Sequence, residues 1–289
     1  METNIQKYMA FVETVRLGSF TEAAEKLNYS QSGISRMIAD LEHDWNLTLL
    51  ERGRFGIRIT SDGLKILPFA KRLCSEFEKI QSQVSDLKGL EKGLIRIGTV
   101  SSVATHWLPK IIKEFQKDYP GIDYEILLGD YLEIEEWIEE GRVDCGFLIL
   151  PVKEEFYSIN LKKDQLMAII PQNHPLAYNK TYPVSRLEKD SFMLLDKGGK
   201  NEISGIFSEN NITPNVRFTT LDDYAIMSMV ENGLGVSILP ELILKRIPYN
   251  ILIKPLDKPA FRDIGFVLRD FDTASIAVKR FMEYLKYRD

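Results

Sequence analysis

The sequence predicts an N-terminal winged helix-turn-helix, a long linking helix and a C-terminal α/β region of two lobes. Three observations predict this order. Two short helical patterns meet across a tight turn in residues 19–42. A heptad pattern of apolar residues then fills residues 61–88. After a short glycine-bounded hinge at 89–93, strand and helix patterns alternate to the end of the chain.

The bulk composition is that of a globular protein with more than one compact unit. The chain has 289 residues, of which 44% are hydrophobic and 27% are charged. No apolar stretch is long enough to span a bilayer, and the first residues show no secretion signal. We therefore expect a cytoplasmic protein with no membrane partner. The net charge of -5 does not exclude nucleic acid, because a small basic face can lie on an acidic protein.

The first two helices have clear boundary signals. Apolar residues recur at helical spacing in 5–17, and Gly18 follows as a C-cap. Ser19 and Glu22 form a capping-box pattern, which predicts that a second helix begins there.

Three further residues meet the geometric demands of a helix-turn-helix. Ala24 is small where two helices would cross closely, and Asn28 tolerates the left-handed backbone of a tight turn. Ile34 is apolar on the inner face of a third helix, predicted over 31–45 with Ser30 as its cap. Together they predict a DNA-binding motif whose third helix enters a major groove.

The residue types on the outer face of the third helix suit double-stranded DNA. Serine hydroxyls and helix N-terminal amides bind phosphate, whereas Gln and Arg can be bidentate to adenine and guanine. Arginines on a predicted β-hairpin, or wing, over 47–60 can meet backbone phosphates or a minor groove. The predicted DNA contacts are Ser30, Gln31, Ser32, Ser35, Arg36, Arg52, Arg54 and Arg58.

The long helix carries a seam suited to a second copy of the chain. Its heptad residues are Ile66, Ala70, Leu73, Phe77, Ile80, Val84 and Leu87. This spacing favours a homodimer, although the helix could instead pack only on its own domain. Pro68 removes one backbone hydrogen bond and is expected to kink the first turns.

The rest of the chain alternates between strand and helix patterns, as in a doubly wound fold. Strands are expected over 94–100, 123–129, 143–150, 165–171, 192–196, 215–220, 235–240, 249–256 and 262–269. Helices are expected over 103–119, 131–141, 203–209, 222–231 and 273–287.

No pattern indicates an enzyme. The sequence has no His/Cys or His/carboxylate cluster with metal spacing, no phosphate loop, no nucleophile elbow and no dinucleotide fingerprint. Cys74 and Cys145 are interpreted as reduced thiols. We expect no catalytic residues, no metal and no cofactor.

The segments FVETVRLGSFTEAAEKLNYSQSGISRMIADLEHDWNLTLLER and RITSDG resemble those of LysR-type transcriptional regulators, and the resemblance covers the whole chain. The family pattern matches Ser30, Gln31, Ser35 and Arg36 on the recognition helix, and Arg52 and Arg54 after the leucine pair. The resemblance implies a DNA-binding domain over 1–60, a dimerising linker helix over 61–88 and a periplasmic-binding-protein-like effector domain over 91–289. It also implies lobe I at 91–161 and 264–289, with lobe II at 162–263.

The effector is expected between the lobes, because open α/β sheets bind ligands where strands end. The predicted effector contacts are Ser101, Ser102, Gly129, Asp130, Leu150, Thr219 and Thr220. Hydroxyls and free amides at helix starts favour an organic anion, whereas Asp130 could meet the amino group of an amino acid. Alternatively, the Ser and Thr residues only cap their helices.

The hypothesis is therefore a DNA-binding transcription regulator controlled by a small-molecule effector. The resemblance implies an interrupted palindrome as the DNA site, a homodimer through the linker helix, a homotetramer, and RNA polymerase as a partner. The alternative is a plain small-molecule binding module or dimeric scaffold whose helix-turn-helix is vestigial. Charge reversal at Arg36, Arg52 and Arg54 distinguishes the two hypotheses. If the DNA-binding domain were idle, these substitutions would leave every activity of the protein intact.

Overall fold

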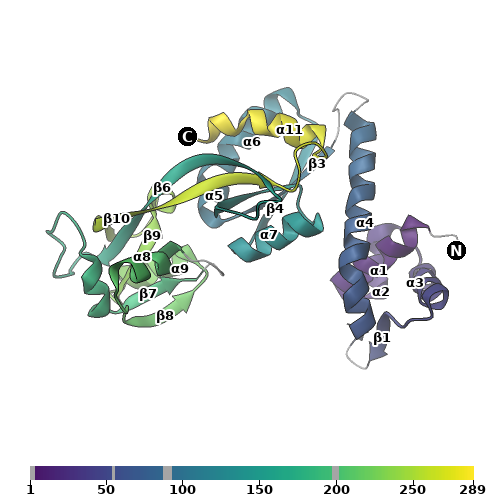
Figure 1. Cartoon of the computed structure of the whole chain (residues 1–289), viewed down its shortest axis with the longest axis horizontal. Helices are drawn as coiled ribbons and strands as arrows, with labels where there is room; N and C mark the ends of the chain where they lie inside the picture. The colour runs from purple at the N-terminus through teal and green to yellow at the C-terminus, as the bar shows by residue number, and fades with distance from the viewer. Residues whose placement is uncertain (1–3, 54–55, 87–92, 197–201) are drawn as a thin grey trace. The chain divides into compact units, whose positions relative to one another are not determined.

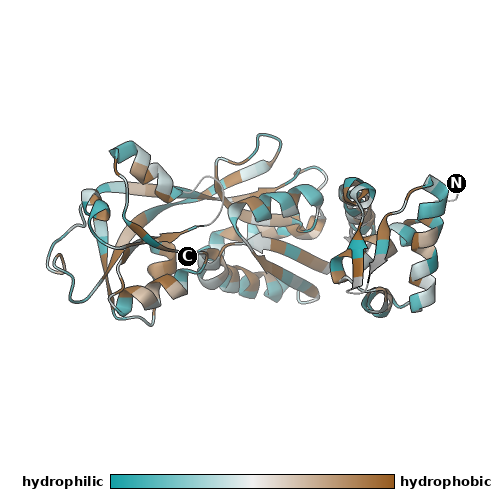
Figure 2. Cartoon of the chain, turned by 90° about the horizontal axis from the view of Figure 1, so that it is seen from below, coloured by the Kyte–Doolittle hydropathy of each residue, from teal (hydrophilic) through white to brown (hydrophobic). Residues whose placement is uncertain are grey.

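The computed structural model in Figure 1 describes residues 4–53, 56–86, 93–196 and 202–289. The chain divides into two compact units, one of residues 1–85 with 140–142 and one of residues 86–139 with 143–289. In the hydropathy colours of Figure 2, helices of both units carry apolar and polar residues on different sides. Among the described residues, no helix is both long enough and apolar enough to cross a membrane.

The first unit consists of four helices and a two-stranded hairpin. They are α1 (Ile5–Leu17), α2 (Phe20–Leu27), α3 (Gln31–Trp45), β1 (Leu50–Gly53), β2 (Gly56–Ile59) and α4 (Ser61–Asp86). Ala24 and Ile34 are buried in its core with Phe11 of α1. The small side chain of Ala24 and the apolar Ile34 therefore lie inside the helix-turn-helix, as predicted.

The predicted helix boundaries of this unit are confirmed. Gly18 (φ 65°) and Asn28 (φ 58°) have left-handed backbones at the ends of α1 and α2. At the start of α2, the Ser19 hydroxyl accepts a hydrogen bond from the backbone N–H of Glu22 at 3.3 Å. The turn between α2 and α3 is thus set by local sequence, because an asparagine accepts the conformation that most residues avoid.

This turn supports a stability prediction. Replacing Asn28 by alanine should lower the free energy of unfolding of the first unit by about 1–2 kcal/mol, because alanine has a Cβ in a left-handed conformation and no polar side chain to compensate. Asn28→Gly is the matched control and should cause no loss, since glycine adopts this conformation freely. Differential scanning calorimetry of both variants measures the effect, and equal stability of the two would contradict it.

The hairpin is the predicted wing. β1 and β2 pair antiparallel, with Leu50 opposite Ile59. The carboxylate of Glu42 on α3 accepts hydrogen bonds from the backbone N–H groups of Leu49 and Leu50, at 2.7 and 3.0 Å. This contact ties the start of the wing to the recognition helix, so α3 and the wing are held in one fixed arrangement.

Helix α4 contains Pro68 and continues as a single helix to the end of its described part. Near its start, Ala70 is buried in the core of the first unit. Further along, the heptad residues Leu73, Ile80 and Val84 are 44%, 58% and 45% exposed. Leu87, the last residue of the predicted seam, lies outside the described residues.

The second unit is built on one mixed eight-stranded sheet, of order β4-β3-β5-β10-β6-β9-β7-β8. Its strands are β3 (Gly93–Thr99), β4 (Ile122–Leu128), β5 (Cys145–Leu150), β6 (Tyr157–Pro171), β7 (Phe192–Leu195), β8 (Val216–Thr220), β9 (Val236–Pro240) and β10 (Ile251–Leu268). Its α-helices are α5 (Ser101–His106), α6 (Leu108–Asp118), α7 (Tyr131–Glu140), α8 (Glu202–Asn210), α9 (Asp223–Glu231), α10 (Glu241–Leu244) and α11 (Ile276–Glu283). Short 3-10 turns lie at η1 (Val184–Glu188) and η2 (Leu285–Arg288).

Two hydrophobic cores give this unit its two lobes. The first core contains residues of β3, β4, β5 and α11, and the second contains residues of β7, α8, α9 and β9. The long antiparallel strands β6 and β10 contribute to both cores and pair along most of their length, as Figure 1 shows. Leu161 packs on the first core and Leu166 in the second, so β6 passes from one core to the other between them.

Four predicted elements of this unit were wrong in detail. The helix expected over 103–119 is broken at Trp107, because Pro109, at the start of α6, has no N–H to donate to the preceding turn and its ring clashes with a carbonyl of that turn. The two strands expected over 249–256 and 262–269 form the single strand β10, with an irregularity between Pro255 and Ala260. The last helix begins at Ile276 rather than at 273, because Ser275 caps it.

Candidate functional site

The outer face of the recognition helix α3 presents polar side chains. Ser30 is its N-cap, and the Ser30 hydroxyl accepts a hydrogen bond from the backbone N–H of Gly33 at 3.1 Å. Gln31, Ser32 and Arg36 are exposed. Ser35 is half-buried on the same helix. The structure therefore separates these residues from the buried side of α3 and leaves the long side chains of Gln31 and Arg36 accessible.

The structure describes the three arginines predicted on the wing to different extents. Arg58 is exposed on β2, opposite Glu51 of β1. Arg52 lies on β1 and its backbone pairs with Ile57, but its side chain is not described. Arg54 lies outside the described residues. Arg58 is thus the wing arginine whose accessible position the structure gives.

Two predicted effector contacts have structural roles where β4 ends. The backbone N–H of Asp130 donates to a carboxylate oxygen of Glu133 at 2.9 Å, and the N–H of Glu133 donates to a carboxylate oxygen of Asp130 at 2.8 Å. This reciprocal pair is a capping box at the start of α7. At Gly129, an added Cβ would lie only 2.5 Å from the Trp137 ring, so glycine permits this close packing. Asp130 therefore has a helix-capping role, which the capping alternative had named only for the Ser and Thr residues, and its Oδ1 already accepts a hydrogen bond.

Ser101 and Ser102 are the first residues of α5, which follows β3. Ser101 is half-buried, whereas Ser102 is buried. The Ser102 hydroxyl accepts a hydrogen bond from Arg262 Nη2 at 2.9 Å. The N-cap of α5 is Val100, which makes no side-chain capping bond. Ser102 therefore belongs to an internal polar network rather than to a helix cap.

The remaining predicted effector contacts lie on different strands. Leu150 ends β5 and pairs with Asp263 of β10, next to Arg262. Thr219 and Thr220 lie on β8, an edge strand separated from β10 by β6, β9 and β7. They were expected at a helix start, but Asp222 caps α9, and the Thr220 hydroxyl instead accepts from the Asp222 backbone N–H at 3.2 Å.

A buried ion pair lies where the two long strands pass between the cores. Asp164 of β6 and Arg262 of β10 are direct partners in the antiparallel register. Arg262 Nε and Nη2 lie 2.9 and 2.8 Å from Asp164 Oδ2, and Asp164 Oδ1 accepts the backbone N–H of Leu242 at 3.0 Å. Asp164 is 0% and Arg262 5% exposed. Two buried charges at this position are tolerable because they pair and hydrogen-bond each other.

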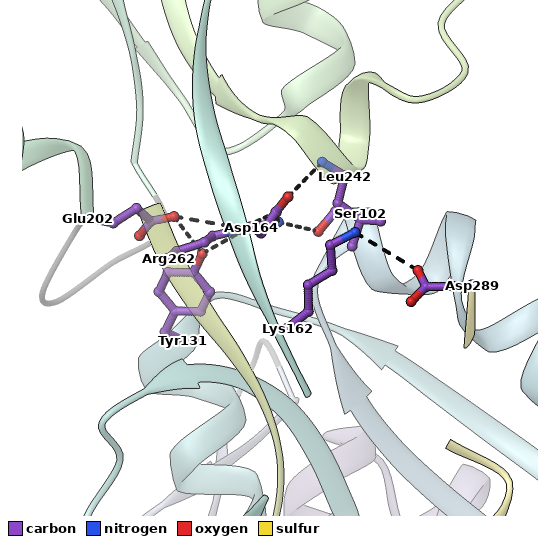
Figure 3. A network of polar contacts seen from close by, with 8 residues as sticks. All are labelled: Ser102, Tyr131, Lys162, Asp164, Glu202, Leu242, Arg262 and Asp289. Carbon is purple, nitrogen blue, oxygen red and sulfur yellow. Dashed lines mark hydrogen bonds and ion pairs between the residues drawn. The ribbon is translucent and has the colours of Figure 1, made fainter. Parts of the chain in front are cut away.

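The same arginine connects to residues of both lobes, as Figure 3 shows. Arg262 Nη1 donates to the Tyr131 hydroxyl at 3.3 Å, and that hydroxyl donates to Glu202 Oε1 at 2.9 Å. Tyr131 packs in the first core, and Glu202 begins α8, which packs in the second. This chain of contacts therefore spans the two lobes at the crossing point.

Burial and charge fix the protonation states in this network. Burial raises the pKa of the Tyr131 phenol, so it stays a neutral hydrogen-bond donor at physiological pH. Burial alone would lower the pKa of the Arg262 guanidinium, but the neighbouring phenol and carboxylates outweigh burial and raise that pKa. Arg262 is therefore charged at any physiological pH.

Sequence reasoning missed Tyr131, Asp164, Glu202 and Arg262 as residues of this site. One signal existed, because Asp164 and Arg262 are charged residues beside apolar strands and lie close to the expected lobe boundaries at 161/162 and 263/264. The pattern could not show that they face each other. Among the described residues, no group of three or more His, Cys, Asp or Glu side chains could hold a metal ion.

Two family comparisons cover nearly the whole chain. The family described as "Bacterial regulatory helix-turn-helix protein, lysR family" matches residues 5–64. The family described as "LysR substrate binding domain" matches residues 88–289. The first match contains the helix-turn-helix and wing, and the second contains the buried network.

Two curated relatives align with this chain over most of its length. The HTH-type transcriptional regulator YvbU of Bacillus subtilis is 30% identical over 285 residues, covering 98% of this chain and 97% of that protein. The probable HTH-type transcriptional regulator LrrA of Synechococcus elongatus is 35% identical over 268 residues, covering 91% and 88%.

Solved structures share the fold. A full-length OxyR variant from Pseudomonas aeruginosa superposes with a TM-score of 0.77 at 20% identity, covering 100% of this chain and 95% of that one. Full-length CbnR complexed with its target DNA superposes with a TM-score of 0.72 at 20% identity, covering 99% and 100%. The chain thus belongs to the LysR family of transcriptional regulators, with an N-terminal helix-turn-helix domain and a C-terminal substrate-binding domain.

Proposed function

We propose that this regulator binds an interrupted palindrome in double-stranded DNA through α3 and the wing, and that a small molecule bound between the lobes controls it. The observation that carries the DNA part is the exposure of Gln31, Ser32 and Arg36 on the outer face of α3. Gln and Arg can read base edges, while Ser32 and Arg58 can contact phosphates. The structure of full-length CbnR complexed with its target DNA, which shares the fold of this chain, supports this proposal.

The exposed seam of α4 supports a homodimer as the DNA-binding form. Leu73, Ile80 and Val84 follow one another at heptad spacing, and in a single chain they are open to solvent. A second α4 would cover them, and two recognition helices would then meet two half-sites related by two-fold symmetry. Association into a homotetramer, contact with RNA polymerase and a cytoplasmic location complete the proposal.

The proposed effector site lies around the ends of β3, β4 and β5 and the buried network beside them. Ser101, Ser102 and Leu150 lie at these strand ends, and Ser102 is joined to Arg262. An organic anion or an amino acid is the expected class of ligand. Such a ligand shifts the regulator only by its preference for one arrangement of the lobes over another.

A gel shift and footprint on the DNA upstream of the chain's own gene test this proposal. We expect a protected site with an interrupted two-fold pattern, whose affinity falls steeply as salt is raised. The logarithm of the binding constant should fall with the logarithm of salt by roughly 0.9 for each phosphate contacted. Lack of protection, or affinity independent of salt, would contradict it and favour a binding module with an idle helix-turn-helix.

A further inference from the structure

Glu202 has a buried carboxylate oxygen, Oε2, that has no hydrogen-bond partner among the described residues. The Glu202 side chain is 10% exposed. Its Oε1 accepts the Tyr131 hydroxyl at 2.9 Å and lies 3.9 Å from Arg262 Nη1. Among the described residues, no group hydrogen-bonds its buried Oε2. A buried carboxylate oxygen without a donor is costly, so this atom marks a place where a donor is missing.

Arg262 forms only a long ion pair with Glu202, with Nη1 3.9 Å from Oε1, because its hydrogen bonds go to other residues. Its Nε and Nη2 contact Asp164 at 2.9 and 2.8 Å, while Nη2 and Nη1 also donate to Ser102 and Tyr131. One guanidinium thus faces two carboxylates, and the closer carboxylate is that of Asp164. Among the described residues of this buried group, the carboxylates outnumber the guanidinium by one.

This excess determines which ligand chemistry the junction can accept. An ammonium group supplies three N–H donors and the positive charge that Glu202 lacks. A purely anionic ligand would instead meet an uncompensated carboxylate in a site of low dielectric, where repulsion is strong. Asp130, to which the sequence assigned an amino group, already accepts a hydrogen bond at Oδ1 as the cap of α7, whereas Glu202 Oε2 accepts none among the described residues.

We infer that the effector carries an ammonium group and that Glu202 Oε2 binds it at the junction of the two lobes. This inference rests on the proposed function and specifies the effector's chemical class. Binding there would join the ligand to α8 of one lobe and, through Tyr131, to α7 of the other. The ligand would therefore act directly on the contacts that connect the lobes.

The test measures binding of small probes to the full-length protein by thermal shift and calorimetry. The probes are methylammonium, glycine and putrescine, each compared with acetate and succinate, which have no ammonium group. We expect at least one ammonium probe to stabilise the protein, with the carboxylates alone having no effect. Glu202→Gln should weaken the binding of that probe roughly tenfold or more. Glu209→Gln is the matched control on the exposed end of α8 and should not change it.

A second variant keeps the result interpretable if Glu202→Gln does not fold. Tyr131→Phe removes the one hydrogen bond that Glu202 Oε1 accepts among the described residues, and it should tighten binding of the ammonium probe several-fold. Three outcomes would overturn the inference: binding of the carboxylates only, equal binding by Glu202→Gln, or no response to any ammonium probe. The DNA footprint distinguishes these failures from failure of the proposed function, because DNA binding by the unliganded protein does not depend on the effector's chemistry.

Discussion

Replacing Arg262 by methionine is expected to lower the free energy of unfolding of the second unit by about 3–5 kcal/mol. The substitution keeps much of the side-chain volume but removes the only positive charge that the structure places against Asp164 among the described residues. Asp164 is fully buried, so its carboxylate would remain charged without a partner or would have to bind a proton. Urea unfolding followed by circular dichroism measures the loss.

Two further variants distinguish the effect of losing the buried ion pair from that of losing an exposed one. Arg280→Met removes an arginine of α11 that lies 2.9 Å from Glu283, but both side chains are about half exposed, and the loss should be far smaller than for Arg262→Met. Adding Asp164→Asn to Arg262→Met should recover part of the stability, because no lone buried carboxylate is left. A loss below about 1 kcal/mol for Arg262→Met alone would contradict the assigned role.

Reversing the charge of Arg36 is expected to weaken binding to the specific DNA site by about 100-fold or more. Arg36→Glu removes an exposed guanidinium from the face of α3 that is proposed to enter the major groove, and it places a carboxylate against DNA. The substituted side chain points away from the core of the first unit, so stability should change little. A gel shift at fixed salt measures the affinity, and calorimetry verifies that the protein is folded.

Lys113→Glu is the charge-matched control for this experiment. Lys113 is exposed on α6 of the second unit, and its reversal changes the net charge of the protein by the same amount. If affinity depended on net charge alone, both variants would weaken binding equally. We expect only Arg36→Glu to abolish the protected site, and unchanged protection by that variant would favour an idle helix-turn-helix.

The sequence by itself determined the local structure of the first unit and the family of the whole chain. Gly18, Asn28 and Ser30 define helix ends through their own conformations and hydrogen bonds, so the helices could be delimited without tertiary information. The outward position of Ser32 and Arg36 followed from helical periodicity alone once Ile34 was taken as buried. Short-range rules are sufficient here because the partners are only a few residues apart.

Only the tertiary structure decided the organisation of the proposed effector site. Arg262 and Asp164 are 98 residues apart, and they face each other because β10 and β6 pair in one register out of many. Glu202 meets Tyr131 because both helices pack near the junction of the two cores, 71 residues apart in the chain. A residue pattern records which side chains are charged, but the identity of the partner that neutralises a buried charge is fixed by strand register and packing.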